Sequence, residues 1–206
     1  MTSNGHNFSS HLTGAEKQYL LKFARETIAR ALQDKAPLGS QSDLDASSQE
    51  LSPILTEPGA SFVTLRRGEQ LRGCIGSLTA RRPLIEDVRQ NALAAAFEDP
   101  RFPPLTEAEL SQVHIEISVL TKPEPLTYES SDELLHKLRP GIDGVIIEHG
   151  WNRGTFLPQV WQQIPNPEEF LTHLCLKARL PGNAWRGSEL KVYTYQVEKF
   201  EERGEV

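Results

Sequence analysis

The sequence predicts an α+β fold in which helices flank a mainly antiparallel sheet. Several β-prone segments are joined to each other as hairpins, one around Gly68 and one around residues 150–154. The segments with helical periodicity lie between these hairpins instead of following each strand in turn. Hairpins with separate helices are typical of α+β proteins, whereas a parallel α/β sheet needs a regular alternation of strand and helix.

The N-terminal part of the chain is expected to be a flexible arm followed by a long helix. Residues 1–12 are polar and lack the apolar core of a secretory signal, so they are expected to be flexible. Thr13 and Glu16 form a capping-box pattern, which starts a helix expected to run to about Gln33. The apolar face of this helix is formed by Leu21, Ala24, Ile28 and Leu32.

A change of composition separates this helix from the first hairpin. Residues 34–60 are rich in Ser, Pro and Gly and have little periodicity, which predicts a surface excursion with one short turn near Leu51. Strands are expected at Ser61–Arg66 and Leu71–Leu78, because Gly68 supplies the turn between them.

The middle of the chain combines helices with one clear strand. Pro83 is expected as the first residue of a helix that continues over Leu84–Phe97, and residues 106–109 start a helical turn. Val113–Val119 alternates apolar and polar residues, which predicts a strand with one apolar face. A further helix is expected at Asp132–Leu138.

The C-terminal part is expected to contain a hairpin, a helix and a last strand. Val145–His149 and Thr155–Val160 form the hairpin, and Glu168–Arg179 has the apolar stripe of a buried helix. Leu190–Val197 is the last strand. The charged residues from Glu198 are expected to be mobile, so the domain covers residues 13–200 and residues 201–206 form a flexible tail.

Charge and cysteine content limit the classes of function. The 206-residue chain has a formal net charge of −6 and a pI near 5.6, which argues against nucleic-acid binding over the whole surface but leaves a local basic site open. No run approaches the ~18 apolar residues that a membrane span needs. Cys74 and Cys175 are too few for a disulfide scaffold, so we expect reduced thiols in a cytoplasmic protein. They are also too far apart in sequence for a metal motif, and no metal site is predicted.

The octet Leu71–Leu78 carries the main candidate site. Cys74 lies between Gly73 and Gly76, where the backbone can take a positive φ or come close to another group. From residue 65 to 82 there are five arginines and one glutamate, a net charge of +4. This charge favours an anionic ligand, or a thiolate that acts as a catalytic nucleophile. The alternative is that Cys74 is a small buried side chain at a tight turn.

Arg72 and the neighbouring glycine amides form the anion-binding part of this hypothesis. A guanidinium fork beside such amides suits phosphate or carboxylate, and Ser77 and Gln159 are included as further substrate contacts. The alternative for Arg72 is a salt bridge within the protein, for which the acids considered are Glu86, Asp87 and Glu116.

His114 and Glu116 lie two residues apart and therefore share the polar face of their strand. This arrangement suits a general base with an orienting partner, or two metal ligands, and Glu116 is the second catalytic candidate. The alternative is a solvated sheet face, or a buried pair that is satisfied by hydrogen bonds.

The sequence Arg72-Gly73-Cys74-Ile75-Gly76-Ser77 resembles the signature of the AMMECR domain family, whose members include AmmeMemoRadiSam system protein A. Further blocks that resemble this family follow in order at residues 94–105, 115–120, 141–145 and 153–161. The resemblance covers most of residues 13–200. It implies two unequal lobes folded as one unit, with the Cys74 motif near the cleft between them, and Memo-like and radical-SAM partners. It leaves the reaction and any cofactor unassigned.

Two functional hypotheses remain open from the sequence. In the first, the protein is an enzyme or part of an enzyme system, in which Arg72 and local amides hold a small anion, Cys74 attacks or carries a group, and Glu116 or a histidine handles a proton. In the second, it is a non-catalytic adaptor or regulatory module that presents the same cleft to a protein or nucleic-acid partner, which the absence of a complete spaced triad favours.

Overall fold

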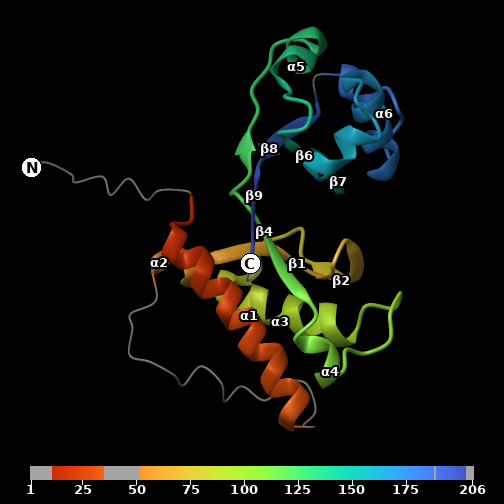
Figure 1. The fold of residues 1–206 in the computed structure, drawn as a ribbon. Coiled ribbons are helices and arrows are strands. Elements are labelled where there is room, and N and C mark those ends of the chain that lie inside the picture. The colour runs from red at the N-terminus through yellow and green to blue at the C-terminus, as the bar shows by residue number, and fades with distance from the viewer. Residues whose placement is uncertain (1–10, 35–51, 188, 203–206) are drawn as a thin grey trace, which may run out of the picture. The chain divides into compact units, whose positions relative to one another are not determined.

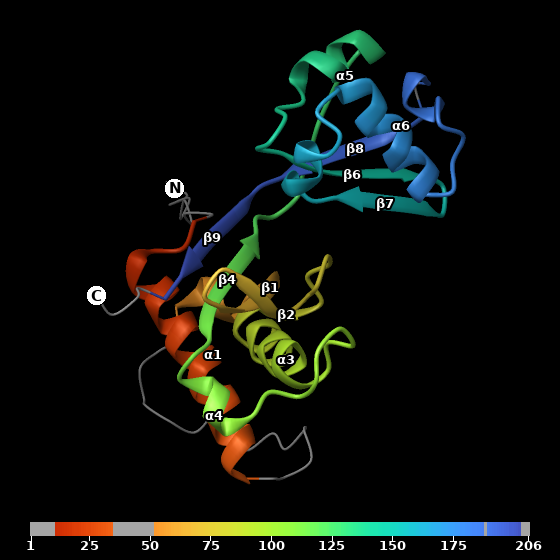
Figure 2. The same ribbon diagram turned by 45° about the vertical axis from the view of Figure 1, so that its right-hand side comes forward.

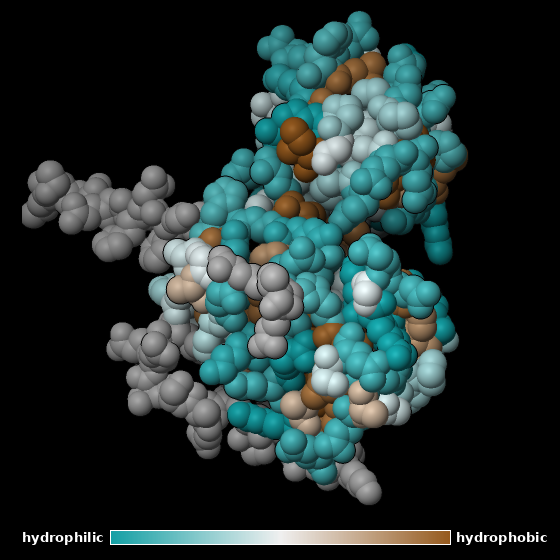
Figure 3. Space-filling view, in the orientation of Figure 1, coloured by the Kyte–Doolittle hydropathy of each residue, from teal (hydrophilic) through white to brown (hydrophobic). Residues whose placement is uncertain are grey.

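The computed structural model describes residues 11–34, 52–187 and 189–202. The chain forms two compact units. The first contains the residues up to Val119 together with those from Glu198, and the second contains Leu120–Val197. On the face shown in Figure 3, hydrophilic residues cover most of the surface, and hydrophobic residues appear in small areas between them. None of the helices in the described ranges is both long enough and apolar enough to cross a membrane.

The first unit is built on an antiparallel sheet with the strand order β2-β1-β4-β9 (Figure 1). Its strands are β1 (Pro58–Arg67), β2 (Gln70–Gly76), β4 (His114–Leu120) and β9 (Val197–Glu201), and the short β3 (Arg82–Pro83) pairs with the start of β1. Helix α3 (Leu84–Phe97) packs on one face of β1 and β2, as Figure 2 shows. Helix α1 (Gly14–Asp34) packs on α3, while α2 (Pro53–Thr56) and α4 (Glu107–Leu110) are single turns.

The β1–β2 hairpin contains a bulge at Arg72. Next to the turn, Arg66 pairs with Leu71, but further on Leu65 pairs with Gly73 and Thr64 pairs with Cys74. One residue of β2, Arg72, is therefore left without a partner position on β1. A bulge of this kind changes the direction in which the following side chains point, and it is common beside functional sites.

Helix α3 and strand β2 come close together because β2 has a glycine at the contact. A Cβ on Gly73 would lie 2.1 Å from the carbonyl oxygen of Ala95 on α3. The core between the sheet and the helices is apolar, and Val63, Leu65 and Ile117 in it are fully buried.

The second unit is a four-stranded antiparallel sheet with the order β5-β8-β6-β7. Its elements are β5 (Glu124–Pro125), α5 (Ser131–Lys137), β6 (Gly144–His149), β7 (Asn152–Phe156), α6 (Pro167–Lys177), β8 (Lys191–Tyr195) and the 3₁₀ helices η2 (Pro158–Gln162) and η3 (Ala184–Arg186). Trp161 stacks on Phe170 of α6 at a centroid distance of 3.6 Å, which helps to fix α6 against the rest of this unit.

The structure confirms the predicted α+β class and antiparallel pairing. The capping box at Thr13 and Glu16 is formed, and α3 occupies the predicted residues. Pro83, however, is the N-cap residue of α3 and not its first helical residue. In β4 the polar face is buried at Glu116 and Ser118, which are only 7% and 8% exposed, whereas His114 is half-buried.

Three expected irregular or mobile segments need correction. Of the expected flexible arm, residues 1–10 lie outside the described residues, but Leu12 is buried in the core. Of the surface excursion, residues 35–51 also lie outside, whereas residues 53–60 form α2 and the start of β1. The expected tail begins with β9, which pairs with β4, and only residues 203–206 lie outside the description.

The loop of the second hairpin is shorter than predicted. His149 pairs with Asn152, so its loop is Gly150-Trp151, and Gly150 has the positive φ of +58° that such a tight turn requires. Strand β7 ends at Phe156, because the chain enters η2 at Pro158.

Candidate functional site

The thiol of Cys74 lies on β2 directly opposite Thr64 of β1. The Thr64 hydroxyl donates a hydrogen bond to Sγ, with an Oγ1–Sγ distance of 3.2 Å. Cys74 is half-buried, whereas Cys175 is fully buried on α6, where burial raises the pKa of its thiol. Cys74 is therefore the more exposed of the two cysteines.

The backbone of Cys74 is held by the loop that follows α3. Because β2 is an edge strand, backbone groups on its outer side have no strand to pair with. The Cys74 N–H donates to Oδ2 of Asp99 at 2.8 Å, and its carbonyl accepts from Nη2 of Arg101 at 3.2 Å. Hydrogen bonds from Arg101, together with those from backbone N–H groups, hold the pKa of Asp99 well below its usual range.

Arg72 is buried and forms a two-point ion pair. Its Nε and Nη2 donate to the Glu109 carboxylate at 2.9 and 3.2 Å, which lowers the pKa of Glu109 to about 2. A salt bridge was an alternative from the sequence, but its partner is none of the three acids considered there. Only 10% of the Arg72 side chain is exposed, and its buried Nη1 has no hydrogen-bond partner among the described residues.

Phe102 links the two arginines of this region. Its ring centroid lies 5.9 Å from the guanidinium carbon of Arg72 and 5.5 Å from that of Arg101, within the range of cation–π contacts. These contacts connect the loop after α3 with the Arg-Gly-Cys motif. We call the connected residues the Cys74 cluster: Thr64, Arg72, Cys74, Asp99, Arg101, Phe102 and Glu109.

The two glycines and Ser77 have structural roles within the first unit. Neither glycine has a positive φ. Gly73 permits the contact with α3, and a Cβ on Gly76 would lie 2.2 Å from the ring of Phe62. The Ser77 hydroxyl donates to Asp87, a carboxylate of α3 that is 1% exposed. Ser77 therefore belongs to a buried network between the hairpin and α3.

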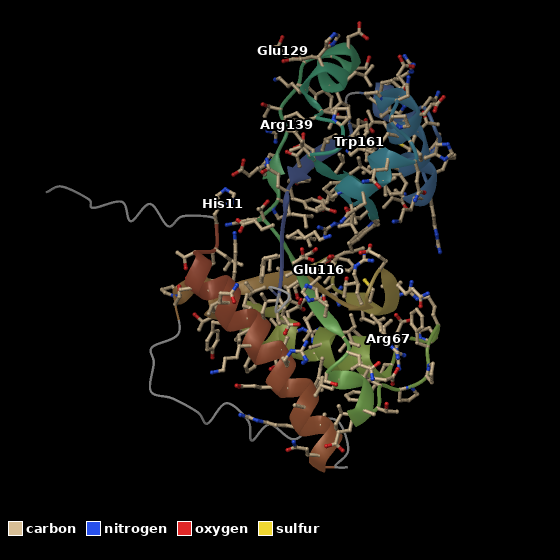
Figure 4. The ribbon with its side chains drawn as sticks, in the orientation of Figure 1. His11, Arg67, Glu116, Glu129, Arg139 and Trp161 are labelled. Carbon is tan, nitrogen blue, oxygen red and sulfur yellow. The ribbon has the colours of Figure 1, made fainter. Side chains whose placement is uncertain are left out.

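Glu116 lies on β4, on the sheet of the first unit (Figure 4). Its carboxylate is 3.8 Å from Nε of Arg66 and 2.7 Å from Nζ of Lys199. His114 instead pairs with Glu201 at 3.6 Å, so each member of the expected His–Glu pair has a different partner.

Gln159 is placed by the second unit, where it is exposed on η2 and does not lie at a strand end. That unit also contains a groove of about 480 Å³, which none of the predicted site residues lines. Within the described residues there is no cluster of three or more histidine, cysteine or acidic side chains that could hold a metal ion.

Sequence reasoning missed Thr64, Phe102 and Glu109 as members of the Cys74 cluster. The pairing of Thr64 with Cys74 can be inferred from the hairpin only when the bulge at Arg72 is known. Without the bulge, the register next to the turn would place Val63 opposite Cys74. Glu109 had a signal in the Thr106 capping box, which is formed, but that pattern does not reveal that the same carboxylate also holds Arg72.

Comparisons with known proteins give a consistent result over most of the chain. A model of the AMMECR1 family matches residues 21–200. A protein from Thermofilum pendens is 42% identical over 203 residues, covering 93% of this chain and 92% of the relative. One from Methanothermobacter thermautotrophicus is 39% identical, covering 94% and 97%. The crystal structure of an uncharacterized protein from Pyrococcus horikoshii is 36% identical, covers 91% of each chain and has a TM-score of 0.67.

Proposed function

The chain belongs to the AMMECR1 family, and from this premise we propose that it binds a small anionic ligand at the Cys74 cluster and acts on that ligand through the Cys74 thiol. In this proposal the protein is an enzyme, or one component of an enzyme system, that works in the cytoplasm. The observation that carries it is the buried Nη1 of Arg72, which has no acceptor among the described residues.

A buried hydrogen-bond donor without an acceptor destabilises a protein by about 1–3 kcal/mol, and by more when the donor is charged, as a guanidinium is. The fork of Arg72 is already occupied by Glu109, so Nη1 is the part that remains for a ligand. An anionic oxygen supplies both the acceptor and the opposite charge. The expected ligand is therefore a small carboxylate or phosphate, in contact with Arg72 through Nη1 and not through the fork.

The remaining site residues have unequal support. The Cys74 amide donates to Asp99, and Ser77 donates to Asp87, which supports a structural role for these two groups. The ion pairs of Glu116 with Arg66 and Lys199 support a role in orienting these cations on the sheet. Gln159 is exposed on η2 of the second unit, and a role for it in ligand binding stays a prediction.

The test is protection of Cys74 from alkylation. We would treat the full chain with iodoacetamide and follow modification of Cys74 by mass spectrometry, with inorganic phosphate or succinate as the protecting anion. Protection is expected in the wild type and should be lost in Arg72→Gln and weakened in Arg72→Lys, which keeps the charge but not the fork geometry.

The matched control is Arg67→Gln. Arg67 ends β1 and is exposed, so this variant makes the same change of charge outside the cluster (Figure 4). The proposal fails if neither anion protects the wild type, or if Arg72→Gln is protected as well as Arg67→Gln. Far-UV circular dichroism of each variant separates loss of binding from loss of fold.

A second function has its own support, namely a non-catalytic adaptor module. Both backbone polar groups of Cys74 and the hydroxyl of Ser77 are occupied inside the first unit, which suits a structural motif. The partners proposed from the family resemblance are Memo-like and radical-SAM proteins. Size-exclusion chromatography of mixed purified proteins would test this: co-elution that survives Cys74→Ala supports the adaptor, and separate elution of all three excludes it.

A further inference from the structure

We propose that Thr64 is a positioning residue for Cys74. The Thr64 hydroxyl stabilises the thiolate form of the Cys74 sulfur and so sets the pH range in which Cys74 reacts. This inference rests on the proposed function, because it matters only if the thiol is used. No sequence motif marks Thr64, and it enters the site through the structure alone.

The geometry of the pair is direct. Thr64 and Cys74 are cross-strand partners, and Oγ1 lies 3.2 Å from Sγ with the hydroxyl as donor. A neutral thiol is a weak acceptor, whereas an ionised acceptor forms a hydrogen bond about twice as strong. The same bond therefore favours the thiolate over the thiol. Thr64 is only 8% exposed, so water does not readily replace its hydroxyl as a donor.

The charged groups around the sulfur largely cancel in pairs. Arg101, at the Cys74 carbonyl, is paired with Asp99, and Arg72 on the same strand is paired with Glu109. On the neighbouring strands Arg66 is paired with Glu116, which also accepts from Lys199. Arg101 also interacts electrostatically with Cys74, but its charge is offset by Asp99, and the hydroxyl of Thr64 is the group that donates a hydrogen bond to the sulfur itself.

A second, independent observation points to a ligand at this end of β2. Arg72 lies two residues from Cys74, is nine-tenths buried and has Nη1 without an acceptor among the described residues. Arg72 and Arg101 contact the same Phe102 ring, and Arg101 also donates to the Cys74 carbonyl. The unpartnered donor and the hydroxyl-bonded thiol thus belong to one cluster.

The experiment measures alkylation of Cys74 by iodoacetamide as a function of pH in the full chain. In this reaction the thiol first releases its proton to the buffer. The thiolate electron pair then forms the carbon–sulfur bond while iodide leaves. Thr64→Val removes the hydroxyl and keeps the branched shape. It should raise the pH midpoint of the reaction by about one unit, which is about a tenfold lower rate below the midpoint. Thr64→Ser should restore most of the wild-type profile.

Two controls complete the design. Thr79→Val makes the same change at an exposed loop position and should leave the profile unchanged. Cys74→Ser gives the background from Cys175. If thermal melting shows that Thr64→Val is unfolded, the pH profile of Cys74 alkylation is measured in Thr64→Ala instead, which removes the same hydroxyl with less steric demand.

The outcomes separate the two proposals. A wild-type thiol that reacts only after denaturation overturns the proposed function and this inference together. A reactive wild-type Cys74 whose pH profile is the same in Thr64→Val or Thr64→Ala overturns the inference alone. A shifted profile without anion protection leaves Thr64 in its role and removes the anionic ligand.

Discussion

Replacement of Asp99 by asparagine should destabilise the first unit by about 2–3 kcal/mol. The carboxylate accepts four hydrogen bonds: two on each oxygen, from the Cys74 N–H and from the backbone N–H, Nε and Nη2 of Arg101. Asparagine keeps one oxygen and presents N–H donors where the other oxygen was, so two acceptor positions are lost. The Arg101 side chain is 53% exposed, so we discount its share for solvent screening.

The stability difference between wild type and Asp99→Asn should depend on pH, in a direction set by the lowered pKa of Asp99. Arg101 lowers the pKa of Asp99 in the folded state. A carboxyl group of this kind contributes stability above its unfolded pKa, near 3.9, and the contribution is lost as the pH falls through the lower folded pKa. The difference between wild type and Asp99→Asn should therefore be constant from about pH 7 to about pH 5 and should shrink below about pH 4.

The assay is urea unfolding followed by far-UV circular dichroism, because all three tryptophans belong to the second unit and their fluorescence does not report on the first. Hydrogen exchange of the Cys74 amide should also become faster in Asp99→Asn. The matched control is Glu98→Gln, an exposed neighbour whose replacement should change stability by less than about 0.5 kcal/mol. Equal stability of the two variants at neutral pH would refute the reasoning.

Three further predictions concern the backbone and the C-terminal strand. Gly73→Ala should destabilise the protein by about 3 kcal/mol or prevent folding in a thermal melt, because its Cβ would lie 2.1 Å from the Ala95 carbonyl oxygen; an unchanged melt would contradict the close contact. Arg179→Gly should raise the free energy of unfolding by about 0.5–1 kcal/mol, because Arg179 has a φ of +60° that glycine adopts without strain; a lower stability in urea would contradict this. Glu202→Gln should cost about 1–2 kcal/mol and increase amide exchange in β9, because Glu202 accepts two bonds from Arg25; unchanged exchange would argue against this anchor.

Local patterns were sufficient for much of the fold. Helix α3 was predicted over Leu84–Phe97, which is the range it occupies, and its residues Leu84, Val88 and Ala95 are buried. The family resemblance from the Arg-Gly-Cys motif is confirmed by the comparisons. Strand β9 was missed because its charged residues have no apolar alternation, and it is held instead by pairing with β4 and by the ion pair of Glu202 with Arg25.

The candidate site was predictable only in part. The sequence located Cys74 and Arg72, but the partner of Arg72 depends on where α4 packs, which no local pattern encodes. The sequence also did not show whether Gly73 and Gly76 are needed for close packing or for a left-handed backbone. Both permit close packing, and neither takes the left-handed backbone that glycine also allows.

The side of the sheet to which the Cys74 sulfur points depends on the number of residues between the hairpin turn and Cys74, because Arg72 is an extra residue in β2. With an even register from the turn, Cys74 would pair with Val63, whose side chain is fully buried, and the thiol would point into the core. A single insertion or deletion between the turn and the cysteine would move it to the opposite face.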